Sequence, residues 1–369
     1  LFPGTEAIEV LTLSHHSREP MDAYAPLICM GFYVMDHARR TISRFLPRRA
    51  CVLATGGAAG AFANTSNVDT AIGSGIALVH RRGGRVRAVH AVQFHPTGLA
   101  LPRRIMGRRE LVTEKVRGDG ARFTDQFGSL IPELQGIELQ PRDQVARALY
   151  TYMRREGRFV YLDLRKGLSG AQIREKFPKL YDVCLKLGLD ITAAPIPVEP
   201  VAHYHNGGVW VDPQTLETSI GRLYALGELK NLAHGYNRLA STSTRECVYD
   251  AWLIAPVLAD LSTLPDAADR LLAWHPDGDK EPAEQLLWNY EGRIKEILWN
   301  WVGIIRAEEE LKTAVQELQS IQEIVQTLYF RTRVSPQVIL VRNLIIVALL
   351  MARGALGERE SCGCHYRVD

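Results

Sequence analysis

A change of pattern late in the chain constrains the fold more than any other feature. Residues 262–281 are rich in Pro, Asp and Gly, as linkers are. Beyond them, apolar residues recur with helical spacing from Ala283 to Phe330, interrupted at Val302–Gly303, and again from Ser335 to Leu356. A C-terminal helical bundle over residues 270–369 is therefore predicted, separate from the part before the linker.

The part before the linker alternates strands with helices. The apolar run at residues 50–54 ends in Gly56 and Gly57, the pattern of a buried strand that enters a tight turn. An amphipathic helix is predicted from Arg142 to Arg155, and a helix with small residues from Asp69 to Arg81. Further strands are expected at 28–34, 40–45, 159–164, 207–212 and 223–228, and further helices at 171–187 and 244–261. This mixture predicts an α/β fold.

Charge and composition exclude several classes of protein. The net charge of +3 gives no global attraction to nucleic acid or to an anionic membrane. The Arg-rich stretches at 81–85 and 103–104 are each interpreted as a solvated face or a turn. The most apolar run, Leu344 to Ala352, is shorter than the ~18 residues that suggest a membrane span, so a buried helix is predicted. No signal peptide pattern opens the chain. A cytoplasmic protein with no nucleic-acid or membrane partner is expected.

The six cysteines are interpreted as reduced thiols. None of them has the spacing of a zinc site, and a chain of this length does not need a disulfide framework. The Cys362–Gly363–Cys364 pair stands alone, and such pairs are usually coincidental. No metal site is predicted.

Six short blocks contain the residue types that bind dicarboxylates and flavins. They are residues 93–97 (QFHPT), 113–121 (TEKVRGDGA), 141–147 (PRDQVAR), 203–209 (HYHNGGV), 224–228 (YALGE) and 237–241 (NRLAS). In order and spacing they resemble the L-aspartate oxidase family of the succinate dehydrogenase/fumarate reductase flavoprotein superfamily. The helical tail adds similar blocks at 302–306, 342–344 and 360–366. The resemblance runs from near residue 50 to the end of the chain.

The resemblance implies a small dicarboxylate substrate, L-aspartate or fumarate. Arginine suits such a site because its guanidinium gives a carboxylate two parallel hydrogen bonds. The residues that would hold the substrate's carboxylates are His95, Thr113, His203 and Arg238. Glu114 and Arg142 would be the catalytic pair beside the Cα that gives up hydride. Since arginine normally stays protonated, Arg142 either transfers a proton in a special environment or only orients the substrate.

Simpler roles for some of these residues stay open. Without its neighbours in the QFHPT block, His95 would more often be a structural or surface residue than a ligand. Arg142 opens a predicted helix between Pro141 and Asp143, so capping or a salt bridge is an alternative to catalysis. Arg147 is expected to be structural.

The resemblance also implies an FAD cofactor. Glycines let the chain pass close to a dinucleotide, and the positive end of a helix favours electron-rich ligand groups. Glu228 resembles the acidic residue that binds the flavin's ribityl chain. The implied FAD-binding residues are Thr55, Gly56, Gly57, Ser74, Glu228, Ser243 and Thr244.

Three departures from the family pattern concern the flavin. No GxGxxG follows an opening strand, so the family's ADP-binding βαβ unit is missing from this sequence. Ser74 stands where the family has an aspartate that contacts FAD. Tyr236 replaces a small residue, and residues 242–245 read TSTR in place of Asn-Ser-Leu-Leu. We therefore expect the chain alone to hold FAD weakly.

The expected architecture is a partial, Rossmann-like FAD-binding domain (1–87 and 206–262), an inserted α+β capping domain (88–205) and the helical domain (270–369). The cap would close over the substrate and exclude water. The implied reaction is oxidation of L-aspartate to iminoaspartate, with hydride passing to FAD and oxygen or fumarate reoxidising it. This is the first step of de novo NAD biosynthesis, and quinolinate synthase would receive the product.

Two alternatives remain. The first is a flavoprotein subunit of succinate dehydrogenase or fumarate reductase, which shares the dicarboxylate site. The second is a degenerate, flavin-free relative that binds only dicarboxylates or a protein partner, which Ser74 and the altered segment 242–245 favour.

Overall fold

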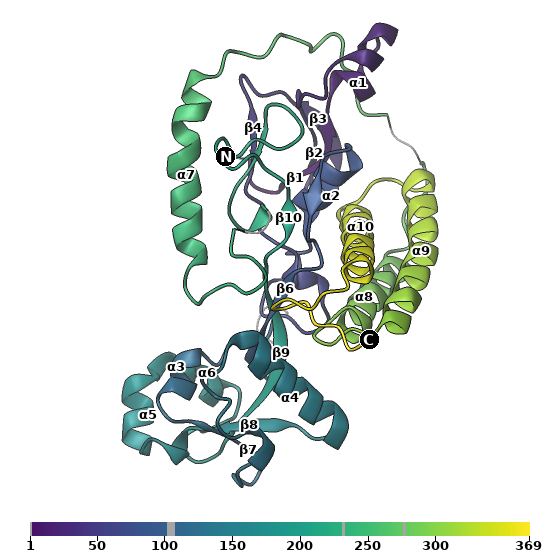
Figure 1. Cartoon of the computed structure of the whole chain (residues 1–369). Coiled ribbons are helices and arrows are strands. Elements are labelled where there is room, and N and C mark those ends of the chain that lie inside the picture. The colour runs from purple at the N-terminus through teal and green to yellow at the C-terminus, as the bar shows by residue number, and fades with distance from the viewer. Residues whose placement is uncertain (1, 102–107, 231–232, 276–277) are drawn as a thin grey trace.

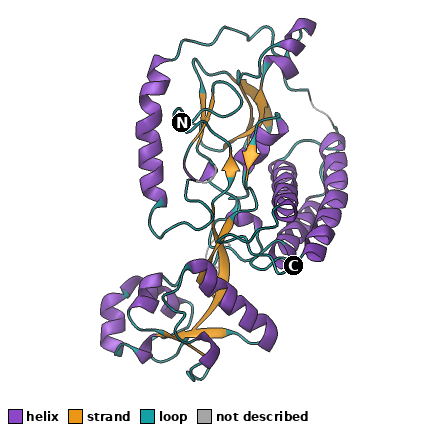
Figure 2. Ribbon diagram, in the orientation of Figure 1, coloured by secondary structure: helices purple, strands orange, loops and turns teal. Residues whose placement is uncertain are grey.

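The computed structural model describes residues 2–101, 108–230, 233–275 and 278–369. The predicted basic turn at 103–104 lies outside these residues. In Figure 1 a mixed region fills the upper half, a second mixed region lies below it, and strands β6 and β9 run between the two. Three C-terminal helices pack beside the upper region. Helices and strands alternate along most of the chain (Figure 2), which confirms the predicted α/β class with a helical C-terminal part.

The upper region contains one larger sheet and two strand pairs. The larger sheet is antiparallel, in the order β1 (Thr5–Leu11), β2 (Gly31–Asp36) and β3 (Thr41–Phe45), with helix α1 (Leu13–His16) between its first two strands. The pairs are β4 (Cys51–Leu53) with β11 (Leu223–Ala225), parallel, and β5 (Val86–Arg87) with β10 (Gly208–Val209), antiparallel. Each pair joins an early segment to a late one, so both segments belong to one folded region.

Two predictions for the upper region need correction. The helix predicted from Asp69 begins only at Ser74, as α2 (Ser74–Arg81), because Gly73 has a left-handed backbone with φ of 82° and interrupts helical geometry. The strand predicted at 207–212 shortens to β10, because the Asp212 carboxylate accepts the backbone N–H groups of Gln214 and Thr215 and so starts a turn.

The lower region is built on a four-stranded antiparallel sheet with its own apolar core. The strand order is β6 (Val92–Leu99), β9 (Ile196–His205), β8 (Val160–Asp163) and β7 (Arg122–Thr124). The helices are α3 (Glu114–Gly118), α4 (Arg142–Glu156), α5 (Gly170–Lys176) and α6 (Pro178–Lys186). Helix α4 matches its prediction and buries Val145 and Leu149 in this core. The single helix predicted at 171–187 is wrong, because Pro178 has no N–H to continue a helix and starts a new one.

The C-terminal helices α8 (Glu284–Trp301), α9 (Glu308–Arg331) and α10 (Pro336–Gly357) pack on one another and on α2. They begin and end close to the predicted positions. Their apolar faces join the core of the upper region, so one continuous core spans both. Helix α10 is long and apolar enough to cross a membrane by length and composition, but 67% of its apolar window is buried inside the fold. The prediction of a buried helix is confirmed.

Helix α7 (Ser243–Asp260) lies along the edge of the upper region (Figure 1) and buries little of itself. Only Asp250 and Ile254 are fully buried, whereas Val248, Tyr249 and Trp252 are exposed. Two carboxylates attach α7 to the region: Asp250 accepts the N–H of Gly227, and Glu246 pairs with Lys230.

Candidate active site

Strands β6 and β9 bring two buried histidines together. Gln93 and His95 are two residues apart on β6 and therefore face the same side of the sheet. The register of β9 shifts so that His203 is an extra residue between those paired with Phe94 and Gln93. Such bulges often redirect a side chain beside an active site. Here the rings of His95 and His203 lie edge to face, with centroids 5.3 Å apart.

The hydrogen bonds of these histidines define their tautomers. The backbone N–H of Thr97 donates to His95 Nδ1 at 3.2 Å, so the proton of a neutral His95 lies on Nε2. The Ser66 hydroxyl bonds to both the Ala202 carbonyl and His203 Nδ1, which assigns the His203 proton to Nδ1. His203 Nε2 is then the acceptor that faces Arg238 Nη2 at 3.3 Å.

Burial keeps both histidines neutral. It lowers the pKa of His95 well below its ordinary value, and the nearby His203 and Arg142 lower it further. Burial likewise lowers the pKa of His203 to about 4, with added repulsion from Arg142 and Arg238. At neutral pH each ring therefore acts as a hydrogen-bonding group without charge.

Glu114 and Arg142 form a two-point ion pair where α3 and α4 begin. Arg142 Nε donates to Glu114 Oε1 at 2.7 Å, and Nη2 donates to Oε2 at 3.3 Å. Burial would raise the pKa of Glu114, but the hydrogen bond and charge of Arg142 outweigh it and hold the pKa below its usual range. The remaining Arg142 nitrogen, Nη1, donates to Gln93 Oε1 at 3.1 Å. Arg142 therefore does form a salt bridge, as the alternative to catalysis supposed, but it forms it with Glu114, the other residue of the predicted catalytic pair.

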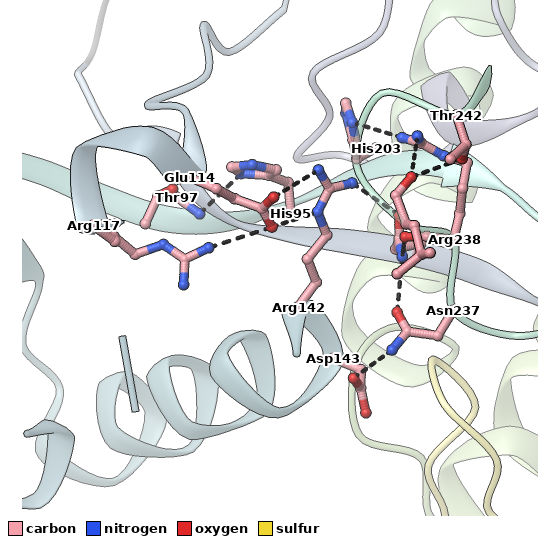
Figure 3. A network of polar contacts seen from close by, with 12 residues as sticks. His95, Thr97, Glu114, Arg117, Arg142, Asp143, His203, Asn237, Arg238 and Thr242 are labelled. Atoms are coloured by element: carbon pink, nitrogen blue, oxygen red, sulfur yellow. Dashed lines mark hydrogen bonds and ion pairs between the residues drawn. The ribbon is translucent and has the colours of Figure 1, made fainter. Parts of the chain in front are cut away.

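Arg238 approaches the histidines from the loop before α7. Its guanidinium lies 4.1 Å over the ring of Tyr204 and donates to the Leu239 carbonyl. Its Nε is buried without a hydrogen-bond partner among the described residues. Burial and the charge of Arg142 lower the pKa of Arg238. We call the five residues His95, Glu114, Arg142, His203 and Arg238 the arginine–histidine cluster (Figure 3).

The cluster carries an excess of positive charge. The cluster itself holds two cations, Arg142 and Arg238, and one carboxylate, Glu114, and the adjoining Arg117, which contacts Glu114, adds a third cation to this group of four charged residues. Since both histidines are neutral, positive charges outnumber negative ones by two. A small dianion would neutralise this excess, and arginine suits carboxylates best because it offers several N–H groups in one plane.

Three residues that the sequence analysis left unassigned hold the cluster together (Figure 3). The Asn237 side chain accepts from Gln93 Nε2 at 2.8 Å and donates to Asp143 Oδ1 at 2.8 Å. Gln93 Nε2 also donates to the Arg238 carbonyl. This bridge ties the start of α4, with Arg142, to the loop that carries Arg238. The only sequence signal was that Gln93, Asp143 and Asn237 all lie within the blocks that carried the resemblance.

Two other predicted residues lie outside the cluster's contacts. Thr113 precedes α3 and is exposed; its carbonyl accepts the N–H of Val116, and its side chain makes no capping hydrogen bond to α3. Arg147, predicted to be structural, pairs with Asp143 and donates to the carbonyl of Gly363, and its guanidinium lies 4.6 Å over Tyr366. It links α4 to the C-terminal loop instead of facing the histidines.

The predicted FAD-binding residues gather at the ends of four elements of the upper region. Thr55, Gly56 and Gly57 follow β4, and Ser74 opens α2. Glu228 lies in the short 3-10 helix η5 (Gly227–Leu229), and Ser243 and Thr244 open α7, which packs on η5. A Cβ added to Gly57 would lie 2.4 Å from Glu228 Oε1, and one added to Gly75 would lie 2.3 Å from Thr55 Oγ1. A Cβ at Gly57 would also lie 2.6 Å from His205 Cβ, so glycine is required there for the close approach.

This group of residues fits a flavin. Gly56 has a left-handed φ of 74° and open space where a side chain would be, so the turn leaves room for a ligand. Glu228 accepts the N–H of His205 at 2.8 Å through Oε1, while burial raises the pKa of its carboxyl to about 7. A half-buried carboxyl of this kind suits the hydroxyl groups of a ribityl chain. Ser74 and Ser243 each begin a helix whose first N–H groups lack partners within the helix.

Comparison with known proteins gives consistent matches. Residues 5–244 match the FAD binding domain family, and residues 291–369 match the fumarate reductase flavoprotein C-terminal family. The L-aspartate oxidase of Vibrio cholerae is 39% identical over 354 residues, which cover 92% of this chain and 63% of that protein. The L-aspartate oxidase of Acinetobacter baylyi is 36% identical over 380 residues, which cover 100% of this chain and 67% of that protein.

The solved structures agree on the fold. An E. coli quinol fumarate reductase superposes with a TM-score of 0.80 at 26% identity, and the match covers 99% of this chain and 65% of that one. The chain therefore spans slightly less than two thirds of the first curated relatives and of this structural relative.

Proposed function

Since the chain belongs to the L-aspartate oxidase family of flavoproteins, we propose that its activity is the FAD-dependent oxidation of L-aspartate to iminoaspartate. The observation that carries the proposal is the arginine–histidine cluster: two guanidinium groups and two neutral imidazoles converge on one buried place beside the residues that fit a flavin. A dicarboxylate matches this charge and this set of donors.

Each residue of the cluster has a task that its contacts support, and that of His203 is to hold the guanidinium of Arg238, from which its Nε2 accepts, beside the substrate. Arg238 and His95 donate to the substrate's carboxylates, and Arg238 still has an unpartnered Nε for this purpose. Arg142 is fixed by Glu114 and Gln93, so we assign to it the orientation of the substrate. Glu114 stays ionised because Arg142 holds its pKa low, and it therefore suits the ammonium group that distinguishes aspartate from succinate.

The flavin side supplies the oxidant. The residues that would hold FAD are Thr55, Gly56, Gly57, Ser74, Glu228, Ser243 and Thr244, and the bound cofactor would supply an acceptor for the hydride that leaves the substrate's Cα. The residues around Gln93 and Asn237 keep the two arginines at a fixed separation, which orients the Cα–H bond. Segment 88–205 is proposed to be the cap that excludes water, and residues 1–87 with 206–262 the remainder of the FAD-binding domain.

The wider setting follows from this reaction. Oxygen or fumarate would reoxidise the flavin, and iminoaspartate would pass to quinolinate synthase as the first step of de novo NAD biosynthesis. A cytoplasmic location is part of the proposal. Thr113 is assigned to the substrate on the family resemblance alone.

A second candidate is the flavoprotein subunit of a succinate dehydrogenase or fumarate reductase. The TM-score of 0.80 with an E. coli quinol fumarate reductase supports it. The two candidates differ in substrate, because an oxidase of this family acts on aspartate whereas a dehydrogenase acts on succinate. The identity of 39% to an L-aspartate oxidase, against 26% to the fumarate reductase, favours the first.

The decisive experiment is the visible absorption spectrum of the purified chain with added FAD, before and after anaerobic L-aspartate. Retained flavin that bleaches with aspartate but not with succinate would support the oxidase, and the reverse would support the dehydrogenase. The Arg238→Gln variant should retain flavin but bleach slowly. A folded chain that retains no flavin would count against both enzymes in this form and favour the flavin-free alternative.

A further inference from the structure

A second cavity lies away from the arginine–histidine cluster, between α2, α9 and α10. Its volume is about 340 Å³. Helix α2 begins at Ser74, with Gly75 close to Thr55 of the turn after β4, and its last two residues, His80 and Arg81, line this cavity. The eight residues of α2 separate the two places by about 10 Å at 1.5 Å per residue. The cavity is therefore distinct from the proposed substrate and flavin sites.

The lining of the cavity combines cations with aliphatic side chains. Nitrogen donors come from His80, Arg81, Arg342 and Arg353, and the amides of Gln322 and Gln326 add to them. The rest of the wall consists of Val, Ile and Leu side chains from α9 and α10. Within the described part of the chain, no carboxylate lines this cavity. Such a wall is polar and positive on one side and apolar on the other.

The charge behind the wall is not balanced. One carboxylate, Glu9, faces three guanidinium groups: Arg81 Nε at 3.2 Å, Arg82 Nη2 at 2.8 Å and Arg342 Nη1 at 3.5 Å. Glu9 and Arg81 are almost fully buried, with 8% and 9% of their side chains exposed. Cations removed from water in this way need anionic partners, since unpaired buried charge is costly. An anion in the cavity would supply the partner that the protein does not.

Two of the arginines have donors to spare. Arg81 is fully engaged, because its nitrogens donate to Glu9, Asn343 and the Ile8 carbonyl. Among the described residues, the Arg342 side chain makes one polar contact, the long one to Glu9, and it lies 3.8 Å over the ring of Tyr329, which holds it in place. Arg353 is an exposed residue of α10 that lines the cavity, and its side chain has no hydrogen bond or ion pair with the described residues.

We propose that this cavity binds a small organic anion whose phosphate or carboxylate group contacts Arg342 and Arg353 and whose apolar part packs on α9 and α10. The proposal goes beyond the oxidase activity and does not depend on it. Both parts of the wall are needed: the arginines for the anionic group and the aliphatic side chains for the body of the ligand. An inorganic anion would use only the first.

Isothermal titration calorimetry of the whole chain tests the proposal with phenyl phosphate, benzoate and inorganic phosphate. We expect one saturable site for phenyl phosphate or benzoate, and binding of inorganic phosphate weaker by roughly tenfold or more because it buries no apolar surface. Whichever of phenyl phosphate and benzoate binds more tightly identifies the preferred anionic group. Absence of saturable binding by both aromatic anions would overturn the proposal.

Surface variants locate the site without disturbing the fold. Arg353→Ala removes a cation from the wall, and Gln326→Glu replaces an amide of the wall with a carboxylate of nearly the same shape. Both variants should bind phenyl phosphate or benzoate roughly tenfold more weakly, since each changes a hydrogen bond to a charged group. Arg331→Ala and Gln316→Glu are the matched controls on exposed positions outside the cavity and should bind as the parent chain does.

A last variant separates this cavity from the substrate site. Arg238→Gln removes a cation of the arginine–histidine cluster and should leave phenyl phosphate binding unchanged. If Arg238→Gln abolishes binding while Arg353→Ala does not, the anion occupies the cluster and the proposal is wrong. Because no flavin or turnover enters this measurement, its result is independent of the proposed oxidase activity.

Discussion

Arg238 of the arginine–histidine cluster lies five residues before helix α7 in the chain, yet the cluster and the helix are held in opposite ways. His95 and His203 lie on long strands between two apolar cores, and every residue of the cluster contacts another through a hydrogen bond or a ring. Helix α7 instead leaves Tyr249 and Trp252 exposed and is attached mainly by Glu246 and Asp250. Packing therefore fixes the cluster that we propose binds the dicarboxylate, whereas a few buried polar contacts fix α7, whose start we propose faces the flavin.

The largest expected effect tests whether the cluster is the substrate site. Arg238→Gln removes the guanidinium that faces His203 and has an unpartnered Nε, so its carboxylate contact is lost. We expect the rate of flavin bleaching by L-aspartate to fall by about 100-fold, as when one aligned donor is removed from an active site. Stopped-flow absorbance at saturating aspartate measures this rate.

The matched control is Arg158→Gln, which removes an exposed arginine of the lower region. It should leave the bleaching rate within twofold of the parent, roughly the scatter of surface changes. If both variants lower the bleaching rate equally, the total charge of the chain, and not the position of Arg238, determines the rate.

The next effect concerns the attachment of α7. Asp250→Ala leaves the buried N–H of Gly227 without an acceptor and takes one of two carboxylates from Lys230. We expect the free energy of unfolding in urea to fall by about 2–3 kcal/mol, because a buried donor and a buried cation lose a partner. Asp260→Ala, at the exposed end of the same helix, should change it by less than about 0.5 kcal/mol.

The next prediction concerns the ionisation of Glu228, which should make the free energy of unfolding depend on pH. Burial raises the pKa of its carboxyl from 4.5 to about 7 in the folded chain. A group with a raised folded pKa stabilises the fold fully below its unfolded pKa and loses that contribution as the pH rises through the folded value. Ionisation of Glu228 should therefore cost about 1–3 kcal/mol between pH 4.5 and pH 7.

Glu228→Gln removes this titration and can still accept the N–H of His205. The unfolding free energies of the variant and the parent, measured in urea at pH 4.5 and pH 8, should differ in favour of the variant only at pH 8. A difference that stays constant with pH would show that the carboxyl of Glu228 is well solvated.

The sequence predicted the residues of the cluster, but not the hydrogen bonds of Gln93, Asp143 and Asn237 that hold the cluster together. His95, Glu114, Arg142, His203 and Arg238 lie together as the ordered blocks implied, and α4 begins at Arg142 as its apolar spacing predicted. The bridge by Asn237 was not predicted, because the partners of an amide side chain depend on contacts between residues 94 and 144 positions apart. Long-range polar contacts leave no periodic pattern in a sequence.

The sequence analysis also missed two local breaks in helices, for a different reason. Apolar residues at helical spacing continue on both sides of Pro178 and Gly73 and so indicate one uninterrupted helix at each place. The backbone restrictions of proline and the left-handed φ of glycine nevertheless end helical geometry there. The sharing of Glu9 by three arginines could not be predicted, because Arg342 is 333 positions away from Glu9 in the chain.

The smallest effect is expected at Trp252 and tests the comparison most directly. Its side chain is 71% exposed, so Trp252→Ser should change the unfolding free energy by less than about 0.5 kcal/mol, whereas Leu149→Ala in the core of the lower region should cost about 2–5 kcal/mol. Urea unfolding followed by circular dichroism measures both. If Trp252→Ser instead costs more than about 1 kcal/mol, this face of α7 is covered in solution and packing holds α7 as it holds the cluster.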